Sequence, residues 1–92
     1  MIISIKGLGY TAIHRIGEGK FRGLDTMLAE ERLAQLNAAT RLSDLTALSS
    51  IGLHKLKGSL REFWSIDVNA GWRIFFKFRN GNASEVQIFD PH

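Results

Sequence analysis

The sequence predicts one α+β domain, in which an N-terminal strand and helices pack on a small mixed sheet that ends in an antiparallel meander. Three observations carry this prediction. Apolar residues recur at helical spacing in the first half, β-branched and aromatic residues take over from about Leu53, and turn sequences divide the second half into short strands. Because 92 residues with 45% hydrophobic side chains suffice for one core, we expect residues 1–92 to form a single domain.

The N-terminal quarter contains a candidate strand and a candidate helix. Residues 2–6 alternate between two faces, as a short strand does, and this strand is expected to end at Gly7-Leu8-Gly9. Residues 10–16 suit a short helix, and residues 17–23 suit a basic loop. The N-terminus does not have the pattern of an export signal, and no stretch of the sequence is apolar for long enough to form a membrane helix. We therefore expect a cytoplasmic protein with no membrane partner.

The clearest helix pattern begins at Asp25 or Thr26, either of which can cap it, and runs to about Thr40. One apolar stripe recurs at helical spacing: Ala29, Leu33 and Leu36. A second apolar set lies roughly opposite: Leu24, Met27, Ala34 and Ala38. This second set indicates either additional core packing or a surface that a partner covers. We expect Ser43 to cap a second short helix that runs to Leu48.

Three strands are expected in the second half, at residues 63–68, 72–79 and about 83–89. Asn69-Ala70-Gly71 supplies a tight connection between the first two. Asn80-Gly81 tolerates positive φ at both positions, which predicts a hairpin into the last strand. Consecutive hairpins of this kind produce an antiparallel meander.

The strand expected at residues 72–79 has one apolar and one basic face. The apolar set is Trp72, Ile74, Phe76 and Phe78, and the opposite set is Arg73, Phe75, Lys77 and Arg79. A basic face with an aromatic ring in its middle suits the phosphates and bases of RNA. The alternative is an ordinary solvated face on which long side chains half cover Phe75, and this segment alone slightly favours that alternative.

Composition favours polyanionic partners and excludes several kinds of site. Twelve Lys and Arg against nine Asp and Glu give a formal charge of +3, with a pI near 9.7. The chain has no cysteine, which excludes a disulfide framework, a thiolate zinc site and a cysteine nucleophile. The three histidines lack metal-ligand spacing and no serine lies in a nucleophile elbow, so we expect no metal and no cofactor.

A second basic cluster, formed by Lys55, Lys57 and Arg61, lies beside His54, and the chain ends in Asp90-Pro91-His92. Cleavage of RNA without a metal needs a base for the 2′-hydroxyl proton, an acid for the departing 5′-oxygen, and cations for the charge that develops on the phosphate. Histidine, aspartate, arginine and lysine side chains suffice for these tasks. Each could equally be an ordinary loop or terminal residue.

Six segments carry a resemblance that runs nearly the length of the chain: Met1-Ile2-Ile3-Ser4-Ile5-Lys6, Arg32-Leu33 to Ala38-Ala39-Thr40, Leu53-His54-Lys55-Leu56-Lys57-Gly58, Trp64-Ser65-Ile66, Asn69-Ala70-Gly71-Trp72-Arg73-Ile74 and Asp90-Pro91-His92. With these segments the sequence resembles the HigB-type toxins among the RelE-like ribosome-dependent endoribonucleases. The resemblance implies the RelE-like microbial ribonuclease toxin fold. It also implies a toxin that enters the A site of the 30S ribosomal subunit, cuts messenger RNA there and inhibits translation.

The resemblance further implies a partner and a set of site residues. The partner is a helix-turn-helix antitoxin, HigA, which neutralises the toxin and represses their shared operon, so that operator DNA is contacted only through the antitoxin. By position, the catalytic set is His54, Lys57, Arg73, Asp90 and His92. His54 or His92 is expected to act as general base or acid, Asp90 to orient a histidine or the sugar, and Arg73 with Lys57 to stabilise the transition state. Further RNA-binding candidates are Lys55, Arg61, Phe75 and Lys77.

Pro91 departs from the family pattern, which usually has a tyrosine between Asp90 and His92. A proline has no aromatic ring or hydroxyl group, and it holds Asp90 extended, although Phe75 or Phe89 could supply some stacking. Two other functions stay open, the first because of Pro91 and the second because of the basic face of residues 72–79. One is a catalytically attenuated relative that acts as an antitoxin-binding co-repressor module, and the other is a general RNA-binding domain that does not use the ribosome.

Overall fold

The computed structural model describes residues 1–5, 23–48 and 51–89, and it shows an α+β arrangement in them. Its elements are α2 (Thr26–Ala38), α3 (Leu42–Thr46), β1 (His54–Lys55), the short 3-10 turn η1 (Gly58–Leu60), β2 (Trp64–Asp67), β3 (Arg73–Arg79) and β4 (Asn82–Phe89). The helix expected at residues 10–16 lies outside the described residues. Within the described ranges, no helix has both the length and the apolar character needed to cross a membrane.

Helix α2 begins where its capping residue predicts. The Asp25 side chain accepts a hydrogen bond from the Leu28 amide at 3.0 Å, so the expected cap is confirmed. The helix ends at Ala38, two residues before the expected end, because Ala39 already has extended backbone angles. The expected stripe is buried, whereas Met27 on the opposite side is 81% exposed.

Helix α3 is capped by a different residue from the one expected. Ser43 lies inside the helix, which begins at Leu42, and the Asp44 carboxylate accepts hydrogen bonds from the Thr40 and Arg41 amides at 2.9 and 3.1 Å. The Thr40 amide and hydroxyl, followed by the Arg41 amide, hold the pKa of Asp44 below its usual range. A carboxylate is a stronger acceptor than a serine hydroxyl, which explains why Asp44 takes this role.

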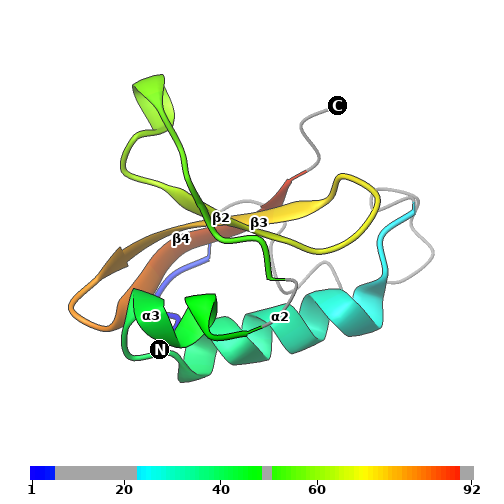
Figure 1. Cartoon of the computed structure of the whole chain (residues 1–92), viewed down its shortest axis with the longest axis horizontal. Helices are drawn as coiled ribbons and strands as arrows, with labels where there is room; N and C mark the ends of the chain where they lie inside the picture. The colour runs from blue at the N-terminus through cyan, green and yellow to red at the C-terminus, as the bar shows by residue number, and fades with distance from the viewer. Residues whose placement is uncertain (6–22, 49–50, 90–92) are drawn as a thin grey trace.

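Strands β2, β3 and β4 form the expected antiparallel meander (Figure 1). The structure adds β1, which was not expected, beside β2, so the order of the sheet is β1-β2-β3-β4. In its register Ser65 pairs with Phe75, and Phe75 pairs with Gln87. The described N-terminal residues lie beside β4, where Ile2 and Ile5 form isolated parallel bridges. The expected first strand is therefore present as two bridges rather than a continuous ladder, and its parallel direction gives the sheet its mixed character.

Helix α2 covers one face of this sheet (Figure 1). The core between them is formed by residues that are at most 2% exposed: Leu33, Leu36, Ile66, Ile74, Phe76 and Val86. Arg32 is also buried, and its Nε donates to the Asp67 carbonyl oxygen at 3.1 Å. The helix is thus joined to β2 by a polar contact as well as by apolar packing.

Helix α2 offers a matched pair of substitutions that tests this packing. Leu36→Ala removes a fully buried side chain, and we expect the free energy of unfolding to fall by about 2–5 kcal/mol. Met27→Ala changes an exposed position on the same helix, and we expect a change within about 0.5 kcal/mol. Urea denaturation followed by circular dichroism measures both. Equal losses would show that the sheet does not pack on the Leu36 side.

Candidate active site

The face of the sheet opposite α2, called the outer face here, carries the candidate site. Because side chains alternate along each strand and partners across strands share a face, the register defines its members. One row is His54, Ser65, Phe75 and Gln87, and the next row is Asp67, Arg73 and Phe89. His54 and Arg73 therefore lie on the same face, two strands apart.

Arg73 is held by a partner that the sequence analysis did not assign. Its Nε lies 3.5 Å from Asp67 Oδ1, directly across the β2–β3 pair. The Arg73 side chain is 40% exposed, so the guanidinium is oriented by Asp67 and still reaches solvent. A pair this exposed contributes little to stability. Its consequence is the orientation of a cation on the outer face.

Asp67 is itself fixed by the loop that precedes β1. Its backbone amide donates to the Ile51 carbonyl oxygen at 2.8 Å. Gly52 has φ of +62°, and a Cβ at this position would overlap the Asp67 carboxylate. Glycine is thus required here both by the backbone conformation and by the space that Asp67 occupies.

His54 lies exposed in the two-residue strand β1, directly opposite Ser65. Ser65 is fully buried, and within the described part of the chain its hydroxyl has no hydrogen-bond partner. A buried hydroxyl without a partner is unfavourable, since it has lost its hydration. His54 and Ser65 are therefore cross-strand neighbours on the outer face, one exposed and the other buried.

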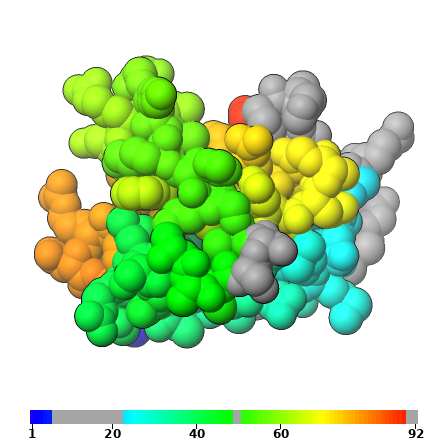
Figure 2. Space-filling view, in the orientation of Figure 1, coloured from blue at the N-terminus to red at the C-terminus, as the bar shows by residue number. Residues whose placement is uncertain are grey.

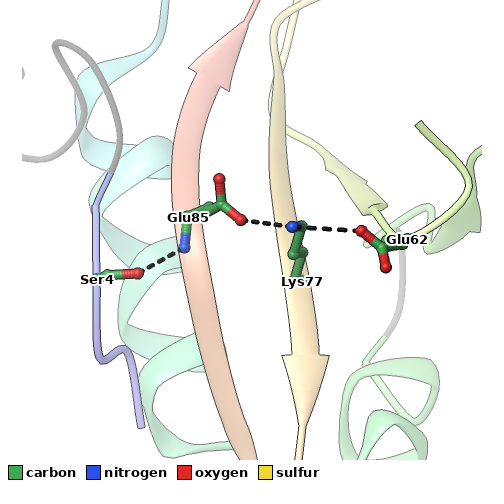
Figure 3. Close-up of polar contacts among 4 residues, drawn as sticks. All are labelled: Ser4, Glu62, Lys77 and Glu85. Atoms are coloured by element: carbon green, nitrogen blue, oxygen red, sulfur yellow. Dashed lines mark hydrogen bonds and ion pairs between the residues drawn. The ribbon is translucent and has the colours of Figure 1, made fainter. Parts of the chain in front are cut away.

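Lys77 was expected to bind RNA, but two carboxylates compensate its charge (Figure 3). Its Nζ lies 2.6 Å from Glu85 Oε2 and 3.4 Å from Glu62 Oε2, and 5.3 Å from the ring centroid of Phe63. The hydrogen bond that Lys77 donates to Glu85, followed by the one that it donates to Glu62, raises the pKa of Lys77. Lys77 consequently ties β3 to β4 and to the segment just before β2.

Glu85 is placed for this contact by an irregularity in β4. The β3–β4 register shifts between Phe75 and Lys77, and Glu85 has φ of +49°. The Ser4 hydroxyl accepts a hydrogen bond from the Glu85 amide at 2.8 Å. The N-terminal residues thus hold the bulge that points Glu85 at Lys77 (Figure 3).

The aromatic residue presented on the outer face is Phe89 rather than Phe75. Phe75 was expected to stack on RNA bases, but it is only 8% exposed, with its ring centroid 5.1 Å from that of Phe89. Phe89 is 43% exposed at the end of β4 and pairs with Arg73. Phe75 therefore packs against the Phe89 ring and is itself largely removed from solvent.

The other expected residues occupy three different places. Lys57 is exposed immediately before η1, and Arg61 is exposed immediately after it. Lys55 lies on the opposite face of β1 from His54, with its Nζ 5.0 Å from the ring centroid of Trp64. Asp90 and His92 lie outside the described residues. Among the described residues, no group of three His, Asp or Glu side chains is arranged to hold a metal ion.

The sequence contains a signal for the Asp67–Arg73 pair that the sequence analysis did not use. A tight turn centred on residues 69–71 makes the flanking positions partners in order, and Asp67 and Arg73 are equally distant from Ala70. Opposite charges at directly paired positions favour each other. No comparable local signal predicts the Lys77 contacts, because they depend on residues 15 positions before and 8 after it.

Most of the chain matches a known protein family. The family model described as RelE-like toxin of type II toxin-antitoxin system HigB matches residues 18–92. The endoribonuclease HigB of Proteus vulgaris is 40% identical over 62 residues, which are 67% of this chain and 66% of that protein. The chain therefore spans just under two thirds of the length of this relative.

Gly52 provides a test of the support beneath Arg73. Gly52→Ala combines backbone strain with the overlap against Asp67, so we expect a loss of about 2–4 kcal/mol in the free energy of unfolding. Gly58→Ala is the matched control, since Gly58 has φ of +66° with open space around it, and we expect a loss of about 1 kcal/mol. Chemical denaturation compares the two, and equal losses would contradict the proximity of Gly52 to Asp67.

Proposed function

This chain belongs to the RelE-like toxins of type II toxin-antitoxin systems, in the HigB family, and we propose that it is an endoribonuclease that cleaves messenger RNA in the ribosomal A site and so inhibits translation. The observation that carries the proposal is an exposed arginine, Arg73, which Asp67 orients on the same sheet face as His54. The relative named endoribonuclease HigB supports the same reaction class.

The proposed reaction uses the 2′-hydroxyl of the RNA as nucleophile. Its oxygen bonds to the adjacent phosphorus while the bond from phosphorus to the 5′-oxygen breaks, leaving a 2′,3′-cyclic phosphate and a free 5′-hydroxyl. One group accepts the 2′-hydroxyl proton and another donates a proton to the 5′-oxygen. We assign these two roles to His54 and His92, without specifying which histidine accepts the proton and which donates it. Asp90 orients a histidine or the sugar.

The charge that develops on the phosphate calls for cations at fixed positions. Arg73 is suited to this task because a planar guanidinium can bind a phosphate through two hydrogen bonds while Asp67 holds its Nε side. Lys57, which is exposed three residues after His54, is assigned the second cation. Phe89 is the exposed ring on this face and is suited to stack on a base.

His54 and Arg73 lie on different strands of the outer face, with β2 between them. The backbones of β1 and β3 lie two strand spacings apart, roughly 10 Å. His54 and Arg73 can therefore contact RNA from two sides of the outer face.

The candidate groups of the outer face lie on separate strands, and this spacing supports dependence on the ribosome. Orienting an RNA strand contributes a large part of the rate enhancement in such reactions, and the ribosomal A site would supply that orientation. Membership of a toxin-antitoxin family implies an antitoxin partner. We propose that this partner is a helix-turn-helix HigA-type protein, that operator DNA is contacted only through it, and that the toxin acts in the cytoplasm.

Mapping of RNA ends on a translated message tests this function. With ribosomes present, the wild-type chain should produce cuts within A-site codons, and naked RNA should remain nearly intact. His54→Gln should slow cleavage by about 10²–10⁴-fold, the range for loss of a general acid or base. Arg73→Gln should slow it by about 10²–10³-fold.

Arg41→Gln is the charge-matched control, because Arg41 is exposed at the start of α3, in the helical part of the chain. It should cut as the wild type does, and circular dichroism should show all three variants folded. Unchanged cleavage by His54→Gln and Arg73→Gln would refute the assigned face. A folded wild-type chain that makes no cuts would favour the antitoxin-binding co-repressor module instead.

A further inference from the structure

A cavity of about 700 Å³ lies beside the C-terminal end of β3, where this strand is no longer paired with β2. Strand β2 begins at Trp64, which pairs with Phe76, so residues 77–79 extend beyond the β2–β3 ladder. The loop that carries η1 bounds the cavity on one side and the β3–β4 hairpin on the other. Figure 2 shows this notch at the left edge, between the yellow-green loop and the orange hairpin. Its volume falls within the range of about 300–1,000 Å³ typical of ligand pockets.

The charged side chains that line the cavity give it a net positive charge. Four are basic and two are acidic: Lys55, Arg61, Lys77, Arg79, Glu62 and Glu85. Both acids contact Lys77, at 3.4 and 2.6 Å. Four positive and two negative side chains leave the lining with a net charge of +2, which favours a ligand with negative charge.

The rest of the lining suits a nucleobase. Trp64 contributes a partly exposed ring, with the Lys55 ammonium 5.0 Å from its centroid. Asn80 and Asn82 contribute amide groups that can both donate and accept hydrogen bonds, as base edges require. Cations, an aromatic ring and amides around one cavity are the combination found where proteins bind single-stranded nucleic acid.

This cavity is distinct from the proposed bond-cleaving residues but continuous with the outer face. Lys55 and His54 are adjacent in β1 and project to opposite faces, so the cavity does not include His54. Lys77 belongs to the outer face by its position two residues from Phe75, and it also lines the cavity. An RNA strand on the outer face could therefore extend past Lys77 into the cavity.

We propose that this cavity is a second RNA subsite, which binds one nucleotide of a single-stranded RNA away from the bond that is cleaved. Arg61 and Arg79 bind the phosphate, and the Trp64 ring stacks on the base. Asn80 and Asn82 contact the base edge. The choice of RNA as ligand rests on the proposed endoribonuclease function, while the cavity and its lining stand independently of it.

Titration of the ¹⁵N-labelled chain with adenosine 5′-monophosphate tests the subsite without requiring cleavage. We expect chemical-shift changes at the Trp64 indole and at the Asn80 and Asn82 side-chain amides, with quenching of tryptophan fluorescence. The double variant Arg61→Gln/Arg79→Gln should bind at least about tenfold more weakly, since each substitution removes a charge-assisted hydrogen bond. The spectra themselves show whether each variant is folded.

Two controls separate the possible outcomes. Arg41→Gln removes the same charge from the helical part of the chain and should bind like the wild type. Arg73→Gln alters the cleavage face and should leave the cavity shifts unchanged, so failure of the subsite is distinguishable from failure of the proposed function. Equal shifts from inorganic phosphate alone or a short acidic peptide, or shifts confined to the outer face, would overturn the proposal.

A purified translation system then shows whether the bound nucleotide comes from the message or from ribosomal RNA. If the nucleotide belongs to the message, Arg61→Gln/Arg79→Gln should change which bases are tolerated near the cut. If it belongs to ribosomal RNA, the double variant should weaken ribosome binding equally for every message. Either result supports an RNA subsite, whereas wild-type cutting and ribosome binding by the double variant would overturn it.

Discussion

The register of β2, β3 and β4 determines both the core and the outer face. In this register Asp67 lies opposite Arg73, and Arg73 lies opposite Phe89. Ile74, the next residue of β3, then projects to the other face and is buried in the core. A slip of one residue would turn Ile74 toward solvent and drive Arg73 into the apolar core. The burial of a few apolar side chains thus fixes the positions of the groups proposed to act on RNA.

Asp67 connects the two layers of the molecule. Its carbonyl oxygen accepts from the buried Arg32 of α2, and its carboxylate holds Arg73 on the outer face. The amide of Asp67 is bonded to the loop that contains Gly52. One residue therefore links the helix, the sheet and the loop before β1, and a disturbance of any of these reaches the Arg73 guanidinium through it.

Local patterns in the sequence were sufficient for most elements of the fold. Alternation and the two turns predicted the meander, and Asp25 predicted the start of α2, because each signal acts over a few residues. The burial of Phe75 and the compensated charge of Lys77 were not predicted. Both depend on β4, where a bulge places Glu85, and on side chains that meet only after the strands have paired.

The most direct test of the outer face as the RNA-binding surface is photo-crosslinking on the ribosome. A message would carry 4-thiouridine in the A-site codon and a 2′-O-methyl group at the scissile nucleotide, so that it binds without being cut. Mass spectrometry then identifies the toxin peptide that is attached. The account predicts crosslinks to the outer face, at or beside His54, Arg73 and Phe89, and crosslinks confined to α2 would contradict it.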